Sequence, residues 1–228
     1  MRTKFEKLFF DNLGKPWNLE RLSMNPNITI NIIRYYDKNS WNWQNLSSNQ
    51  NITIVDVVCN NDLPWNYKYL SSNKNVNLQI VKDNPEINWC WNFLSRNPSI
   101  SLKNIEDNTE LPWQWKAVSL REDLKVDFIE KHIDQDWDWL SFSSKEKLAI
   151  RLFPKYPHKN WFWFVLSSNR YLTFDLIDRF EKRWNWEMIS RHKGLTVEFV
   201  EKYKDKSWDW VYLSMQSFEN DKHLTYPN

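Results

Sequence analysis

The stretch "SWNWQNLSSNQNIT", from Ser40 to Thr53, decides the fold because related stretches recur along the chain. We count its first tryptophan as position zero of a repeat copy, and equivalent tryptophans follow every 24 residues, with one interval of 23. Nine copies begin at Trp17, Trp41, Trp65, Trp89, Trp113, Trp137, Trp161, Trp184 and Trp208. Position six is serine in every copy, at Ser23, Ser47, Ser71, Ser95, Ser119, Ser143, Ser167, Ser190 and Ser214. A register kept this long is a tandem repeat, and periods of about 20 to 50 residues are typical of solenoid proteins.

Each copy carries the signals of two short helices. Position one is Asn or Asp in six copies, and these residues favour a helix N-cap because their side chains accept a hydrogen bond from a free backbone N–H. Position twelve is Thr or Ser in five copies and marks a second start. Apolar residues before each cap and four residues after it form a hydrophobic staple. The first caps are Asn18, Asn42, Asn66, Asp138, Asn185 and Asp209, and the second caps are Thr29, Thr53, Ser101, Thr173 and Thr196.

This pattern predicts an all-α chain, an α-solenoid of about nine 24-residue helical-hairpin repeats. Residues 1–15 are expected to form an N-terminal capping helix, with Phe5, Leu8 and Phe9 on its apolar face. Residues 16–216 are expected to form a single domain of tandem Trp-rich helical repeats, and residues 217–228 a polar C-terminal tail. Copy six has Ala149 at the second cap position and Pro154 inside its expected second helix, so we interpret it as a degenerate copy or a bend.

The fixed residues are expected to have structural roles. All 16 tryptophans lie at position zero or position two, and we expect both rows to be largely buried, apart from the terminal copies. A Trp-lined cage for a carbohydrate or a methyl-lysine is the alternative. Asn at position eight is expected to end the first helix in the left-handed conformation. Nine identical serines are interpreted as small residues between closely packed helices, with the hydroxyl bonded to the preceding turn, because nine identical nucleophiles make no chemical sense.

Composition argues against several classes of protein. The 228 residues include 31 Lys and Arg against 29 Asp and Glu, so net charge indicates no polyanionic partner. No apolar run approaches the length of a membrane span, and the charged N-terminus lacks a signal-peptide core. We expect Cys59 and Cys90 to be free thiols in a reducing compartment. The predicted location is therefore cytoplasmic, with no secretion.

The sequence shows no motif for catalysis. Two glycines, Gly14 and Gly194, leave no phosphate-binding loop or dinucleotide fingerprint. The four histidines have no Cys or carboxylate at metal-ligand spacing. Asp138 and Asp209 resemble the paired acids of glycosidases, but both lie at N-cap positions. We therefore predict a protein that is not an enzyme and has no cofactor and no metal site.

The predicted function is a non-enzymatic scaffold that mediates protein–protein interaction. Solenoids present a surface built from residues that vary between copies. On the second helix this variation falls at positions fourteen, seventeen and eighteen. The candidate partner-binding residues there are Arg34, Tyr35, Lys82, Glu106, Glu130, Lys131, Asp178 and Arg179. The alternative is a solvated face with no partner. We expect a protein partner, no membrane, and a monomer in preference to an oligomer.

A nucleic-acid-binding solenoid is the alternative function. Basic residues fall at positions seven to nine of consecutive copies, and a row of cations could follow a phosphate backbone. This ridge consists of Arg96, Arg121, Lys145, Arg170 and Arg191. Acids at Glu122, Asp123 and Glu146 interrupt it, and the first three copies lack it. Salt dependence of binding would separate the two functions.

The motif W-x-W-x-x-L-S-x-N-x-x-I-T resembles the Trp-rich tandem repeats of proteins from large DNA viruses of amoebae. The resemblance covers about residues 16–215 and lies in the repeat motif alone. It implies the same repeat architecture and a viral origin, either in an infected host cell or as a structural, virion-associated component. It assigns no activity and no functional residues. Copy five, with Arg121-Glu122-Asp123, and copy six depart from the Asn-Pro part of the motif.

Overall fold

The computed structural model describes residues 2–218, with the side chain of Lys182 excepted. Over this range the chain forms eighteen α-helices and two short 3-10 helices, and it contains no strand. The predicted all-α repeat fold is confirmed, with α1 (Lys4–Phe10) preceding the first copy. Most of the predicted C-terminal tail, residues 219–228, lies outside the described range.

The helices alternate between two positions in each copy. The first helices are α2 (Leu19–Ser23), α4 (Trp43–Ser48), α6 (Tyr67–Leu70), α8 (Trp91–Leu94), α10 (Trp115–Val118), α12 (Trp139–Phe142), α14 (Trp163–Ser167), α16 (Trp186–Ile189) and α18 (Trp210–Leu213). The second helices are α3 (Ile30–Ile33), α5 (Ile54–Cys59), α7 (Leu78–Asp83), α9 (Leu102–Glu106), α11 (Val126–Lys131), α13 (Glu146–Leu152), α15 (Phe174–Arg179) and α17 (Val197–Lys202). The 3-10 helices η1 (Lys38–Ser40) and η2 (Glu181–Arg183) precede Trp41 and Trp184. The second helices have four to seven residues, shorter than the eight or so that the staple spacing suggests.

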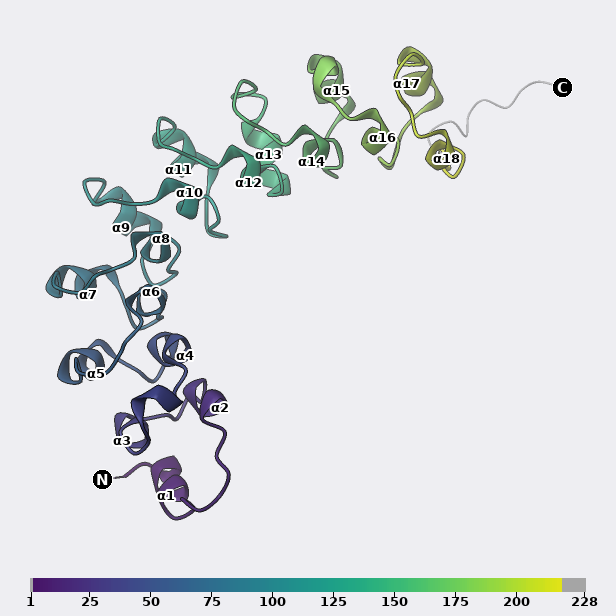
Figure 1. Cartoon of the computed structure of the whole chain (residues 1–228). Coiled ribbons are helices and arrows are strands. Elements are labelled where there is room, and N and C mark those ends of the chain that lie inside the picture. Colours follow the sequence, from purple (N-terminus) through teal and green to yellow (C-terminus); the bar gives the residue numbers. More distant parts are fainter. Residues whose placement is uncertain (1, 219–228) are drawn as a thin grey trace. The chain divides into compact units, whose positions relative to one another are not determined.

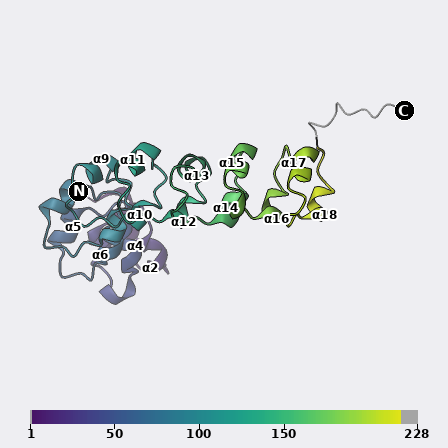
Figure 2. The same ribbon diagram turned by 90° about the horizontal axis from the view of Figure 1, so that it is seen from above.

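The chain divides into two compact units, Met1–Asp123 and Leu124–Asn228. In the first unit, Figure 1 shows α2, α4, α6 and α8 along one side and α3, α5, α7 and α9 along the other. In the second unit, α12, α14, α16 and α18 lie in one row and α13, α15 and α17 in another, in both views (Figures 1 and 2). First helices contact first helices, as α4 contacts α6 and α14 contacts α16. The repeat therefore places chemically equivalent residues in rows.

The N-caps of the first helices are as predicted. In all six copies with Asn or Asp at position one, that side chain accepts a hydrogen bond from the backbone N–H three residues later. Thr53, Ser101, Thr173 and Thr196 cap second helices in the same way. Thr29 begins α3 without a side-chain cap bond. Its hydroxyl donates instead to Glu6 at 2.6 Å.

Copy six differs from the prediction. Its second helix, α13, begins at Glu146, about one turn earlier than the second helices of other copies, and it ends at Leu152. Pro154 therefore follows the C-cap residue Phe153 and does not lie inside the helix. Proline disfavours the helical conformation of the residue before it and offers no N–H, so the helix forms upstream of it. Ala149 is a fully buried residue within α13 and not a failed cap.

The two tryptophan rows are buried to different extents. At position zero every Trp is buried except Trp17, which is half-buried. Each of these indoles donates its N–H to a backbone carbonyl near the end of the preceding helix, as Trp65 does to Asn60 at 2.9 Å. At position two only Trp139 and Trp186 are buried, and Trp210 is 63% exposed. The expectation of largely buried rows outside the terminal copies is thus confirmed for position zero, whereas at position two the other tryptophans outside the terminal copies are half-buried.

Position-two tryptophans nevertheless have a fixed packing partner. Five of them pack edge-to-face on the position-zero Trp of the next copy, with ring centroids 5.1 Å apart for Trp43 on Trp65 and for Trp91 on Trp113. Three pairs in the second unit repeat this geometry: Trp139 with Trp161, Trp163 with Trp184, and Trp186 with Trp208. Such pairs contribute about 0.5–1.5 kcal/mol beyond the area that they bury. Neighbouring copies are therefore joined by an aromatic contact.

Serine at position six joins copies by a hydrogen bond. Ser71 is fully buried, and its hydroxyl donates to the carbonyl of Tyr67 at 2.7 Å in its own helix. The same oxygen accepts the backbone N–H of Cys90, position one of the next copy, at 2.9 Å. Only a small side chain with both a donor and an acceptor can do this in a filled space. The prediction of a close-packed serine bonded to the preceding turn is confirmed, whereas the bond to the next copy was not predicted.

Asparagine at position eight has a different role from the predicted one. No described residue has a positive φ except Phe218 and Gly194, so these asparagines do not form left-handed caps. Asn73 is fully buried, and its Nδ2 lies 3.0 Å from the carbonyl oxygen of Ser47 and 2.9 Å from that of Asn49. Its Oδ1 accepts the N–H of Asn75. Asn49, Asn73 and Asn97 form a ladder of side chains that bind the carbonyls at the end of the previous copy's first helix, whereas Asn169 binds the carbonyl of Glu146.

Helix α1 is tied to copy one through Glu6 and Phe9. Phe9 is fully buried and packs on Trp17, whereas Leu8 is 53% exposed, contrary to the predicted apolar face. Glu6 is 3% exposed, and its carboxylate accepts hydrogen bonds from Thr29, Asn31 and the backbone of Thr3. The bond from Thr29 contributes most to lowering the pKa of Glu6 below its ordinary value, against the opposing effect of burial. The sequence pattern of apolar residues gave no sign of this buried carboxylate.

Candidate interaction surfaces

Four of the eight predicted partner-binding residues on the second helices are bonded to a neighbouring copy. Arg34 forms a bidentate pair with Asp62, at 2.7 and 3.2 Å, and its Nε donates to Asn60 at 2.8 Å. Lys82 donates to Asn108 one copy further on. The carboxylate of Glu130 pairs with the ammonium of Lys155 at 2.6 Å, and that of Asp178 with the ammonium of Lys202 at 2.7 Å. In these copies, the residue types along this face therefore vary because each side chain is matched to its partner in the adjacent copy.

The other four predicted residues lie on second helices of both units or just after them. Tyr35 is 48% exposed and packs edge-to-face on Phe10. The guanidinium of Arg179 lies over the ring of Phe180, 5.3 Å from its centroid. Glu106 ends α9 in the first unit, and Lys131 ends α11 in the second. The eight residues are thus spread over both units, four in each.

The ion pairs on this face are exposed and contribute little to stability. The side chains of Arg34 and Asp62 are 43% and 62% exposed, and exposed pairs are worth about 0–1 kcal/mol. Around Asp178, burial alone would raise the carboxyl pKa, but hydrogen bonds from Lys202 and Tyr203 lower it below its ordinary value.

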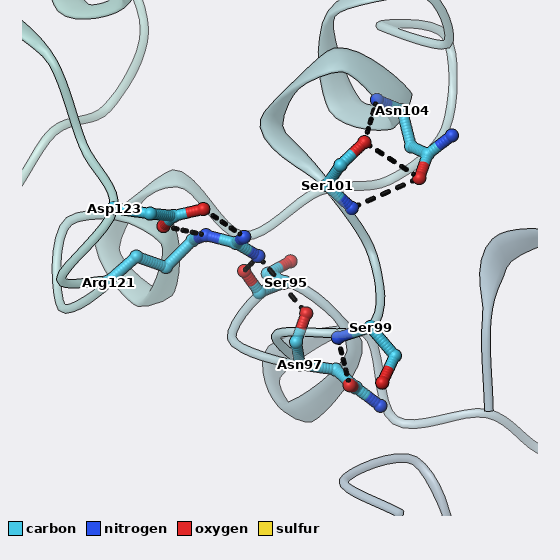
Figure 3. Close-up of polar contacts among 7 residues, drawn as sticks. All are labelled: Ser95, Asn97, Ser99, Ser101, Asn104, Arg121 and Asp123. Carbon is cyan, nitrogen blue, oxygen red and sulfur yellow. Dashed lines mark hydrogen bonds and ion pairs between the residues drawn. The ribbon is translucent and has the colours of Figure 1, made fainter. Parts of the chain in front are cut away.

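The predicted basic ridge is not a row of exposed cations. Arg121 is 6% exposed and occupies position eight, where four other copies have a buried asparagine. Its Nη1 points at the carbonyls of Asn97 and Ser95, at 3.2 and 3.4 Å, and its Nε and Nη2 bind Asp123 at 2.8 and 2.7 Å (Figure 3). Arg121 therefore replaces a rung of the ladder, and Asp123 neutralises the buried charge.

The other ridge residues have separate environments. Arg96 is exposed beside α8. Lys145 is the N-cap residue of α13. Arg170 pairs with Glu146 at 2.8 Å, and Arg191 lies 3.8 Å from Asp209. Arg96 and Arg121 belong to the first unit and the other three to the second.

An open groove of about 690 Å³ lies along the starts of α4, α6 and α8 in the first unit. Position-two aromatics and amide side chains line it. The residues that define this aromatic groove are Trp43, Tyr67, Trp91, Asn88, Asn92 and Gln114. A second hollow of about 600 Å³ shares Asn88, Trp89 and Trp91 with it, so Trp91 is exposed to both.

The groove follows from how the first helices begin. Each helix starts at position two, so the large side chain there stands at the helix end and only one of its sides is covered by the next copy. The Trp43 indole also donates to the carbonyl of Lys38 at 2.7 Å, which fixes its orientation. Sequence reasoning missed this groove because it assigned both tryptophan rows to the core. The sequence signal for the groove was the polar residue at position one, which lies between the aromatic residues at positions zero and two.

Two further findings concern the described residues. No group of three or more His, Cys, Asp or Glu side chains within residues 2–218 is placed to hold a metal ion. In the same range, no helix is both long and apolar enough to pass through a lipid bilayer. Cys59 and Cys90 are free thiols, as predicted.

Comparisons with known proteins give no relative: no family model, no curated protein and no solved structure matches the chain.

Proposed function

We propose that this protein is a non-enzymatic repeat scaffold that binds an extended segment of a partner protein in the aromatic groove of the first unit. The observation that carries the proposal is the row of Trp43, Tyr67 and Trp91, aromatic side chains that are half-buried on a folded surface. Tyr and Trp are enriched at protein interfaces because they bury a large area at a small cost in conformational entropy.

The groove is pre-organised for binding. Edge-to-face contacts with Trp65 and Trp113 hold Trp43 and Trp91 in place, so little side-chain freedom is lost when a partner covers them. Asn88 and Asn92 are exposed beside Trp91. Their amides offer both donors and acceptors, which an extended peptide requires because its own backbone groups are unpaired.

Two features support a binding protein over the alternatives. The repeated serines are buried and hydrogen-bonded in eight copies, an environment suited to packing and not to attack on a substrate. Arg121 is buried, and Arg170 pairs with an acid, which weakens the case for a phosphate-binding ridge. The resemblance of the repeat motif to viral Trp-rich repeats supports a viral scaffold that acts in the cytoplasm of an infected cell.

The test is affinity capture from the producing cell with the intact chain and two double variants. Tyr67→Ser with Trp91→Ser alters the groove, and Val55→Ser with Val58→Ser alters exposed apolar residues of α5 in the opposite row. We expect one protein partner to be lost with the groove variant, to be retained with the α5 variant, and to resist high salt. Loss with the α5 variant alone would place binding on the second helices. Capture of nucleic acid that high salt releases would favour the basic ridge.

A further inference from the structure

Three kinds of contact recur between successive copies, although not every junction has all three. The position-one N–H donates to the preceding serine hydroxyl, as Asn66 does to Ser47 at 2.8 Å. The position-eight side chain donates to the preceding serine carbonyl, as Asn73 does to Ser47 at 3.0 Å. The position-two Trp packs against the following position-zero Trp, as Trp43 does on Trp65. Toward the following copy, a copy thus presents hydrogen-bond acceptors and an aromatic ring, and we call this its forward face. Toward the preceding copy it presents hydrogen-bond donors, and we call this its backward face.

At α18, no residue within 2–218 covers the forward face. Ser214 is exposed, whereas the serines of the eight earlier copies are 0–1% exposed. Its hydroxyl donates to the carbonyl of Val211 at 2.7 Å, but within residues 2–218 it accepts no N–H. Trp210 is 63% exposed, whereas Trp186 is buried at the same position under Trp208. The last described copy therefore lacks the neighbour that covers every other copy.

The backward face is open at copy one. Asn18 uses its side chain as an N-cap, but its backbone N–H makes no hydrogen bond among the described residues. Asn25 accepts the N–H of Asn27 through Oδ1, and its Nδ2 donates to nothing within the same range. Asn25 and Trp17 are half-buried, whereas the equivalent residues of copy two, Asn49 and Trp41, are buried. This is the donor set that matches the acceptors at Ser214.

Helix α1 occupies the place of a second helix. Phe9 lies 24 residues before Ile33, and both are fully buried. The carbonyl of Asn12 accepts the Trp17 indole N–H at 3.0 Å, as that of Asn60 accepts the Trp65 indole N–H. Helix α1 also contacts α3, as the second helix α11 contacts α13. The chain thus carries a second helix ahead of its first complete copy.

Within residues 2–218, no second helix follows α18, the last helix described. A cleft of about 390 Å³ lies between α17 and α18, lined mainly by apolar side chains including Val197, Val200, Trp210, Leu213 and Phe218. An apolar cleft next to exposed Trp210 and Val211 (75% exposed) is costly to leave in water. Residues of a second helix fill the equivalent place in the preceding copies.

We propose that a second copy of this chain docks head-to-tail on α18. The Asn18 N–H and the Asn25 amide of the incoming copy bind Ser214, its Trp17 packs on Trp210, and its α1 enters the cleft beside α17. The joint reproduces the contacts between copies inside the chain. A two-fold arrangement does not, because it sets acceptors against acceptors. The inference is independent of the proposed function and departs from the monomer expected from the sequence.

The test uses two single variants of the full chain, each blocking one end. Trp210→Glu places a charge on the forward face at an exposed residue. Asn25→Asp is isosteric, keeps the acceptor for Asn27, and sets a carboxylate against the carbonyls of the docking copy. Mass is measured by sedimentation equilibrium from about 1 to about 200 µM, because self-association depends on concentration. Val55→Glu, at an exposed residue of α5, is the control.

We expect the parent chain and Val55→Glu to associate, and each blocked variant alone to associate at least about tenfold more weakly. An equimolar mixture of the two blocked variants must form dimers and nothing larger. Trp210→Glu keeps only its backward face and Asn25→Asp keeps only its forward face, so each molecule can bind one partner. Circular dichroism checks that each variant is folded. A monomeric parent at every concentration, or a mixture that stays monomeric, overturns the proposal. So does association that only Trp210→Glu abolishes, because that indicates a tail-to-tail dimer.

Discussion

Replacing Asn73 with alanine removes one rung of the ladder that joins copies two and three. The side chain is fully buried. Its Nδ2 lies 3.0, 2.9 and 3.3 Å from the carbonyl oxygens of Ser47, Asn49 and Ile52, and its Oδ1 accepts the N–H of Asn75 at 2.9 Å. Alanine makes none of these bonds and leaves carbonyls without this donor at a buried helix end.

The cost follows from the number of bonds. An amide has two N–H donors, so three carbonyls share two donors, and one further bond is made through Oδ1. At about 1 kcal/mol for each bond, with buried acceptors left unpaired, we expect Asn73→Ala to lower the free energy of unfolding by about 3 kcal/mol. In a repeat protein this cost falls on the contact between neighbouring copies, so the urea transition should also broaden.

Asn25→Ala is the matched control. Asn25 occupies the same position in copy one, but its Nδ2 is unused and only the bond from the Asn27 N–H to its Oδ1 is lost. We expect a cost below about 1 kcal/mol. Both variants are compared with the parent by urea unfolding followed by circular dichroism, at a concentration low enough to suppress association. Equal midpoints for the two variants would refute the ladder as a source of stability.

Three further predictions concern other fixed positions. Ser95→Leu overpacks a fully buried site and should cost about 1–3 kcal/mol, with a broader urea transition, whereas Ser95→Ala should cost about 1 kcal/mol; equal midpoints would mean that the site is not filled. Cys90→Asn supplies the missing cap of α8 and should raise stability by about 0.5–1 kcal/mol in thermal unfolding, whereas Cys59→Asn, at the last residue of α5, should not. Burial lowers the pKa of His192, and its bond to the Ser167 carbonyl opposes this only partly, so the unfolded state binds more protons below about pH 6.5. The urea midpoint should therefore fall between pH 7 and pH 5 and fall less in His192→Asn; the same dependence in both chains contradicts this role.

The sequence alone determined the repeat register, the helical class and the positions of most helix starts. These features depend on local interactions, in which a cap such as Asn42 and the N–H that it binds are three residues apart. Pro154 shows the limit of this reasoning, since the proline was correctly taken as incompatible with a helix interior but the helix simply formed earlier in the chain. The sequence pattern also identified serine as a packing residue.

Only the tertiary structure decided what the polar residues that recur in the motif bind. The partners of Asn73 and of Arg121 lie mostly 21 to 26 residues away. The local sequence therefore suggests a helix cap for the asparagine and an exposed cation for the arginine. Separations of 28 and 24 residues likewise hide the pairs of Arg34 with Asp62 and of Asp178 with Lys202, so that a variable face looks available to a partner. Burial of position two likewise depends on how much of the ring the next copy covers. Local rules fix where a helix begins, but the environment of a side chain is fixed by neighbours that are adjacent in space and a full repeat away in sequence.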